Sequence, residues 1–250
     1  MGKYEFTYNQ EIGHQGQSLL PHFPGGKSGV TIGPGYDMSM RSAEQIISDL
    51  TSVGVDPEIA ETLSHAAYKS GLQAQQWIGS HGGLYITEDQ QRALFDLVLV
   101  PEYEERMISQ INDIYQNNPS RQHQPIVYEQ LSEHQKEILF DYTYNVGLSR
   151  FPTLVDAVLQ KDWQTVSFHY ERFSGDEPLF YRNEMFYSTF LSEEGIEKYE
   201  NLTQEFDELG KIDSILDDMA DDDFQNTNDI SYHDKSHDPD MDELLDESHW

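Results

Sequence analysis

Apolar residues recur at helical spacing along most of the chain. Four stripes of this kind follow a capping signal, and these signals are Ser42 with Gln45, Asp56 with Pro57, Thr87 with Gln90, and Ser132 with Gln135. Two further stripes cover residues 152–163 and 182–191. The pattern predicts six or more helices. A break is expected at Pro101, and the helix that starts at Pro57 is expected to end at Gly71.

One segment near the N-terminus departs from this pattern. Residues 24–37 hold five glycines and two prolines. Such a composition excludes a helix and suits tight turns around a short strand, predicted at Val30–Gly33. The chain shows neither an alternation of strands and helices nor an internal repeat. We therefore expect an α+β fold, predominantly helical, with a small glycine-rich β segment followed by a helical lobe.

The character of the chain changes at Lys211. The last forty residues carry 14 acidic side chains against two lysines, a local charge of −12. Runs such as Asp221-Asp222-Asp223 cannot be packed without partners. We expect one folded domain over residues 1–210 and an acidic, flexible tail over 211–250. Scattered Leu, Met and Phe residues leave open that the tail docks on a basic partner, against the simpler role of a solvated extension.

The charge of the whole chain limits its partners. The formal net charge is −31, which argues against binding to nucleic acid or to anionic membrane surfaces. The chain contains no cysteine, so disulfides, thiolate catalysis and cysteine zinc sites are excluded. No apolar signal core or membrane-length apolar window is visible. We expect a protein made in the cytoplasm without membrane insertion.

Candidate chemistry centres on Glu11, Thr31 and Asp37. Two carboxylates that flank a cleft are the minimum requirement for glycoside hydrolysis. Gly26-Lys27-Ser28 resembles the end of a phosphate-binding loop, but Pro21 stands where that motif needs glycine, and no helix signal follows. Nucleotide binding is therefore rejected. No metal-site pattern is present, and we expect neither a metal nor a cofactor.

The order of these residues resembles the phage-type lysozymes. Glu11 is followed by Thr31-Ile32-Gly33-x-Gly35-Tyr36 and then by a helical lobe. Supporting matches are Ile86-Thr87-x-x-Gln90, Leu131-Ser132-x-x-Gln135, Asn145-Val146-Gly147 and, with one residue less in its spacing, Arg182-x-Glu184. The resemblance covers residues 5–205. It implies a lysozyme-like fold and a muramidase that cleaves the β-1,4 bond between N-acetylmuramic acid and N-acetylglucosamine in the glycan strand of peptidoglycan.

One position departs from the phage-type pattern. Gly25 stands where that family carries its aspartate. The chain is more similar to pesticin-like bacteriocin muramidases and to the lysozyme-like domains of bacterial antagonism effectors, in which the aspartate follows the threonine, as Asp37 follows Thr31. This resemblance implies Glu11 as the general acid, with Asp37 and Thr31 positioning water. A simpler alternative is that Asp37 only caps the turn before Ser39.

The resemblance also suggests further contacts and a biological setting. The candidates for sugar contact or for bracing Glu11 are His22, Tyr36, Tyr144 and Arg182, with His14 as a weaker one; structural roles stay open for each. An effector would act in the periplasm of a target cell, with a secretion-system carrier and a periplasmic immunity protein as partners. The alternatives are a phage endolysin, or a lysozyme-like module that binds the wall or a partner without catalysis.

Overall fold

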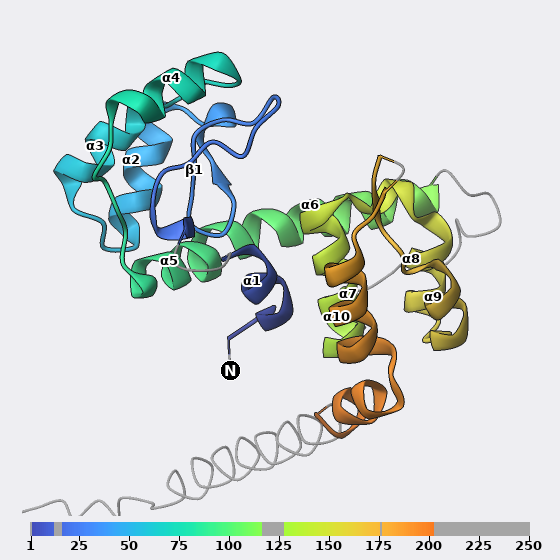
Figure 1. The fold of residues 1–250 in the computed structure, drawn as a ribbon. Coiled ribbons are helices and arrows are strands. Elements are labelled where there is room, and N and C mark those ends of the chain that lie inside the picture. Colours follow the sequence, from blue (N-terminus) through green and yellow to red (C-terminus); the bar gives the residue numbers. More distant parts are fainter. Residues whose placement is uncertain (1, 13–16, 117–127, 176, 203–250) are drawn as a thin grey trace, which may run out of the picture. The chain divides into compact units, whose positions relative to one another are not determined.

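The computed structural model describes residues 2–12, 17–116, 128–175 and 177–202, which belong to one compact unit, Met1–Thr203. Within these ranges the fold is α+β and predominantly helical, as predicted, with two small antiparallel sheets (Figure 1). The predicted acidic tail, its boundary at residue 210, and His14 lie outside the described residues.

The elements follow one another in a simple order. The strands are β1 (Thr31–Ile32), β2 (Tyr36–Asp37), β3 (Phe173–Ser174) and β4 (Glu177–Pro178). The α-helices are α1 (Glu5–Glu11), α2 (Ala43–Ser52), α3 (Pro57–Ser64), α4 (Leu72–Ser80), α5 (Glu88–Leu94), α6 (Val100–Gln116), α7 (Glu133–Asn145), α8 (Pro152–Leu159), α9 (Trp163–His169) and α10 (Phe180–Phe186). Shorter turns are η1 (Gln17–Leu19), η2 (Met38–Met40), η3 (Phe95–Leu99), η4 (Tyr128–Gln130), η5 (Leu148–Arg150) and η6 (Tyr187–Leu191).

The glycine-rich segment forms a hairpin where a single strand was predicted. Strands β1 and β2 pair antiparallel, with Thr31 opposite Asp37 and Ile32 opposite Tyr36. The turn between them passes through Gly33 at φ 62° and Gly35 at φ 109°. Only glycine adopts both conformations without steric cost. These two glycines therefore permit a tight return of the chain.

The predicted helix starts are confirmed. The hydroxyls of Ser42, Thr87 and Ser132 each accept a hydrogen bond from a backbone N–H three residues on, and Asp56 caps α3. Capping boxes with reciprocal glutamine contacts are complete at Thr87 and Ser132. Capping of this kind satisfies backbone donors that the helix itself leaves unpaired. Local sequence alone therefore fixes where these four helices begin.

The predicted end of α3 at Gly71 is wrong. The helix stops at Ser64, and Gly71, at φ 53°, instead precedes a separate helix, α4. Two more elements escaped the sequence pattern, α1 and the β3–β4 hairpin. Helix α1 has only seven residues, too few for a periodic stripe to stand out. The stripe at 152–163 is likewise two helices, because Asp162 caps a new one at Trp163.

The predicted break at Pro101 is also wrong, because α6 runs through this residue. A proline lacks the N–H that bonds the carbonyl four residues back, and its ring crowds that turn. Here η3 is a π-helical turn, in which the N–H of Val100 bonds the carbonyl of Phe95. This wider turn directly precedes the proline and lets the helical path continue. Figure 1 shows α5 and α6 as one long stretch between the α2–α4 helices and the α7–α10 helices.

Helix α7 lies in the core. Its residues from Ile138 to Thr143 are all buried, and it packs against α1, α6 and α8. The ring of Tyr4, just before α1, stacks on Phe140 with centroids 3.6 Å apart. A charged side chain, Asp141, lies in the middle of this apolar run. The core helix therefore carries a carboxylate into the interior.

Gly29 fixes the base of the hairpin. Its N–H donates to Asp37 at 3.2 Å, and its carbonyl accepts from the hydroxyl of Thr31 at 3.4 Å. A Cβ atom at position 29 would lie 2.2 Å from the nearer carboxylate oxygen of Asp37 and 2.8 Å from the backbone nitrogen of Ser39. Because the nitrogen belongs to the backbone, the clash cannot be relieved by a side-chain rotation alone. The absence of a side chain is therefore required here.

We predict that Gly29→Ala lowers the free energy of unfolding by about 1–3 kcal/mol, the usual cost of overpacking. Gly79→Ala is the matched control: it lies in α4 with no atom within 4 Å of its added Cβ, and should be neutral or stabilise by about 0.5–1 kcal/mol. Urea denaturation measures both. A Gly29→Ala protein as stable as the native chain would show that the hairpin base is looser than described.

Candidate active site

A buried carboxylate organises the site. Asp141 on α7 and Arg172, just before β3, are both fully buried, and their charged atoms lie 2.6 Å apart. The guanidinium of Arg172 also lies 4.0 Å from the ring centroid of Tyr142 and 4.6 Å from that of Phe186. The hydroxyl of Thr7 on α1 donates to Asp141 at 3.2 Å. Asp141 therefore receives contacts from two other parts of the chain.

Arg182 links this carboxylate to Glu11. From α10, Nη2 of Arg182 donates to Asp141 at 2.5 Å, and Nη1 donates to Glu11 at 2.6 Å. A planar guanidinium can hold two carboxylates at once in a fixed relative orientation. Arg182 thus braces Glu11, one of the two roles that the sequence left open for it. Three helices, α1, α7 and α10, meet at this side chain.

Glu11 is the last residue of α1, and its side chain is 23% exposed. Burial raises the pKa of its carboxyl, and the charge of Arg182 acts in the opposite direction without cancelling the effect. A carboxyl with a raised pKa keeps its proton to higher pH and can donate it to a bound group. The position and electrostatics of Glu11 fit a general acid.

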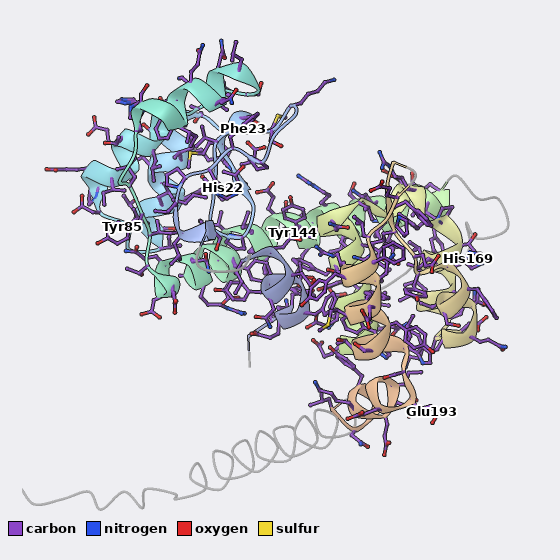
Figure 2. The ribbon with its side chains drawn as sticks, in the orientation of Figure 1. His22, Phe23, Tyr85, Tyr144, His169 and Glu193 are labelled. Carbon is purple, nitrogen blue, oxygen red and sulfur yellow. The ribbon has the colours of Figure 1, made fainter. Side chains whose placement is uncertain are left out.

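Tyr144 connects this part of the site to the hairpin. Its hydroxyl donates to the carbonyl of Pro34 at 2.5 Å, and its ring stacks on Tyr103 at 4.0 Å. Burial raises the pKa of both tyrosines, and the nearby charge of Glu11 contributes to each. Figure 2 labels Tyr144 on α7. The hydroxyl of Tyr144 has a structural partner in the hairpin turn, and the residue is half-buried.

Three predicted site residues form a row across the hairpin. Thr31 pairs with Asp37 on one side and, through an isolated bridge, with His22 on the other. Residues directly opposite each other in antiparallel pairing project to the same face. His22, labelled in Figure 2, also approaches the carbonyl of Leu20 with Nδ1 at 3.0 Å. The structure thus brings His22, Thr31 and Asp37 together.

The carboxylate of Asp37 is held by the backbone. One oxygen accepts from the N–H of Ser39 at 2.7 Å and the other from the N–H of Gly29 at 3.2 Å. The first contact is the cap that the sequence offered as an alternative to catalysis. Each carboxylate oxygen keeps a second lone pair, so a further water or hydroxyl can still be bound. The observed contacts fit both interpretations of Asp37.

Asp37 lines a cavity of about 650 Å³. The cavity lies between the hairpin, α2 and the start of α6, with walls that include Gly35, Asp37, Arg41, Asp49, Glu102 and Tyr103. Glu11 is not among its lining residues. Tyr103 lines the cavity, and the charge of Glu11 contributes to the raised pKa of its hydroxyl. A ligand in this cavity would contact Asp37 directly.

Tyr36 has a packing role in place of the predicted sugar contact. It is fully buried, and its hydroxyl donates to Asp49 at 2.7 Å. The guanidinium of Arg41 lies 4.2 Å from its ring centroid and reaches Glu102 at 2.5 Å. This group of side chains ties the hairpin to α2 and α6. The ring therefore offers no surface to a ligand.

Sequence reasoning missed Asp141 and Arg172. A lone acid between Phe140 and Tyr142, inside an apolar helical stripe, is a signal that could have identified Asp141, since a buried carboxylate needs a partner. No comparable signal marks Arg172, because its counter-ion lies 31 positions away in the sequence. Only the folded chain shows the pairing.

Two features are absent from the residues that the structure describes. No group of three or more His, Asp or Glu side chains in these ranges could hold a metal ion. None of the described helices combines the length and the apolar character needed to cross a membrane.

Residues 4–161 match the model of a protein family described as a domain of unknown function, DUF8812. The chain belongs to the DUF8812 family. The matched region includes Glu11, the hairpin and Asp141, and it ends before Arg172 and Arg182. No curated protein matches the sequence. The DUF8812 match therefore groups the chain with relatives and assigns it no activity.

For this DUF8812 protein we predict that Asp141→Asn lowers the free energy of unfolding by about 3–5 kcal/mol, because it leaves Arg172 buried without a counter-charge. Adding Arg172→Met to Asp141→Asn should recover much of the loss, since the unpaired charge is then removed. A double-mutant cycle in urea measures the coupling. Additive effects of the two substitutions would contradict the pairing.

Proposed function

We propose that this protein is a lysozyme-like glycoside hydrolase that cleaves the β-1,4 glycan strand of peptidoglycan. The observation that carries the proposal is Glu11, a partly buried glutamate with a raised pKa, braced by Arg182 and electrostatically coupled to Tyr144, whose hydroxyl bonds the hairpin turn. The short helix that ends at Glu11, the glycine-rich hairpin and the helical part that follows support a lysozyme-like fold.

In the proposed reaction Glu11 donates its proton to the glycosidic oxygen as the bond breaks, and positive charge develops at the sugar carbon. Asp37, whose carboxylate is held in place by two backbone donors, stabilises this charge or orients the attacking water, with the hydroxyl of Thr31 as a second contact. Because Glu11 must be protonated to act, cleavage should fall as the pH rises through its raised pKa.

A second candidate is a lysozyme-like module that binds wall glycan or a partner without cleaving it. The observation that favours this candidate is the capping role of Asp37, whose two oxygens already accept from Ser39 and Gly29.

For the hydrolase, we propose an effector delivered to a rival's periplasm by a secretion-system carrier and countered by an immunity protein. A phage endolysin is the alternative setting.

Digestion of purified sacculi tests the hydrolase. The native chain should release soluble muropeptides, and Glu11→Gln should lower the rate by about 100-fold or more, the usual contribution of a general acid. Glu61→Gln, an exposed change on α3, is the control and should leave the rate unchanged. Release by Glu11→Gln at the native rate would remove Glu11 from the mechanism.

Asp37→Asn separates the two roles of Asp37. The amide keeps an oxygen that can accept from Ser39 but loses the negative charge. Loss of digestion at an unchanged melting temperature supports catalysis, whereas unchanged digestion restricts Asp37 to capping.

Retention of the native protein on sacculi without glycan cleavage, over a range of pH and salt, would favour the binding module.

A further inference from the structure

A second hollow is formed by the segment that joins α3 to α4 and by α4 itself. This groove has a volume of about 540 Å³. We refer to it as the Tyr68 groove, and its walls include Tyr68, Lys69, Gln73, Gln76, Trp77 and His81. It shares none of its lining residues with the cavity at Asp37. The groove is a separate feature of the same compact unit.

Tyr68 is strained and exposed at once. Its φ is 57°, in the left-handed region, and 65% of its surface is accessible. For a bulky side chain this backbone conformation is an outlier that glycine would adopt without cost. A ring with so much exposed surface adds little to the core. Strain kept at an exposed aromatic residue is a frequent mark of ligand-binding positions.

Trp77 supplies an unsatisfied donor in the wall of the groove. The residue is 5% exposed, and its indole N–H is buried without an acceptor among the described residues. Its ring stacks on His81 with centroids 4.2 Å apart, and Nδ1 of His81 lies 2.8 Å from the carbonyl of Trp77. Buried donors nearly always have a partner. An unpaired N–H in a residue that lines the groove is therefore a position where an oxygen carried by a ligand would be favourable.

The remaining lining is mostly polar and free of acids. Gln73 and Gln76 are exposed and three residues apart on α4, so their amides share one face. Lys69 is the only formally charged residue of the groove at neutral pH, in a chain with 46 acidic residues. Aromatic faces beside amide donors and acceptors suit a neutral or weakly anionic ligand rich in hydroxyls and amides.

We propose that the Tyr68 groove binds N-acetylhexosamine units of a glycan, outside the cleavage site. The ring of Tyr68 would contact the C–H face of the sugar, and the two glutamines would bond its hydroxyl and acetamido groups. The choice of sugar rests on the proposed function. The groove is tied to the hairpin, because Ser70 pairs with Gly29 and the N–H of Tyr68 bonds the carbonyl of Met38. Binding there holds a polymeric substrate beside Thr31 and Asp37.

Trp77 can report this binding directly. The chain has three tryptophans, so Trp163→Phe with Trp250→Phe leaves Trp77 as the sole indole emitter. These changes are made in the full chain with Glu11→Gln, which prevents cleavage of the probe under the proposed mechanism. Titration with soluble chitotetraose should give a saturable change in Trp77 fluorescence.

Tyr68→Gly is the decisive variant. Glycine relieves the backbone strain, so the melting temperature should hold or rise while the affinity for chitotetraose falls tenfold or more. Tyr85→Ala is the matched control: Tyr85 is 61% exposed, is labelled in Figure 2 and lies outside the groove. The affinity of Tyr85→Ala for chitotetraose should be unchanged. If Tyr68→Gly lowers the melting temperature, Gln73→Ala, a change to a strong helix former, must show the same loss of binding.

The absence of a saturable Trp77 response, or native affinity in Tyr68→Gly and Gln73→Ala, would overturn the proposal. The two functional claims fail separately. If the native chain cleaves sacculi but Trp77 fluorescence does not respond to chitotetraose, the groove proposal is contradicted and the hydrolase proposal stands. If Trp77 fluorescence responds but the native chain cleaves no sacculi, the groove proposal stands and the hydrolase proposal is contradicted.

Discussion

The contact on which the candidate site depends is the pairing of Asp141 with two arginines inside the core. A fully buried carboxylate is unfavourable unless it is neutralised and hydrogen-bonded. Arg172 neutralises it from the start of the β3–β4 hairpin, and Arg182 from α10. Because Arg182 also bonds Glu11, the same requirement that fixes the core helix fixes the end of α1. The ion pairs that neutralise the buried carboxylate therefore also set the geometry of the candidate site.

This arrangement sets two opposing influences on Glu11. Burial favours the protonated carboxyl, and Arg182 favours the ionised one, with burial the larger. Asp141 moderates the arginine by sharing it. A glutamate held in this balance is fixed in position and still able to exchange a proton, which is the combination that a general acid needs. Without Arg182 the position of Glu11 would no longer be fixed. If Glu11 were fully exposed, its pKa would no longer be raised by burial.

How well the sequence predicts a feature depends on how far apart in the chain the interacting residues lie. Caps at Ser42, Asp56, Thr87 and Ser132 use neighbouring residues, and all four were predicted correctly. The π turn that carries the helix through Pro101 and the pairing of Asp141 with Arg172 depend on the folded context, and were missed. Glu11 was identified as a candidate from its place before the glycine-rich segment, and Arg182 was one of its possible braces, but helix α1 was missed. Local chemistry determines where elements begin, and long-range pairing determines how the site is built.

The most direct test of this account is the titration of the Glu11 carboxyl by ¹³C NMR, with the assignment fixed by Glu11→Gln. We expect a pKa above 4.5, the ordinary value for a glutamate, and a further rise in Arg182→Gln, because the neutral amide no longer favours the ionised form. A pKa at or below 4.5 in the native chain, or one that Arg182→Gln leaves unmoved, would contradict the claim that burial and the shared arginine together set the proton affinity of Glu11.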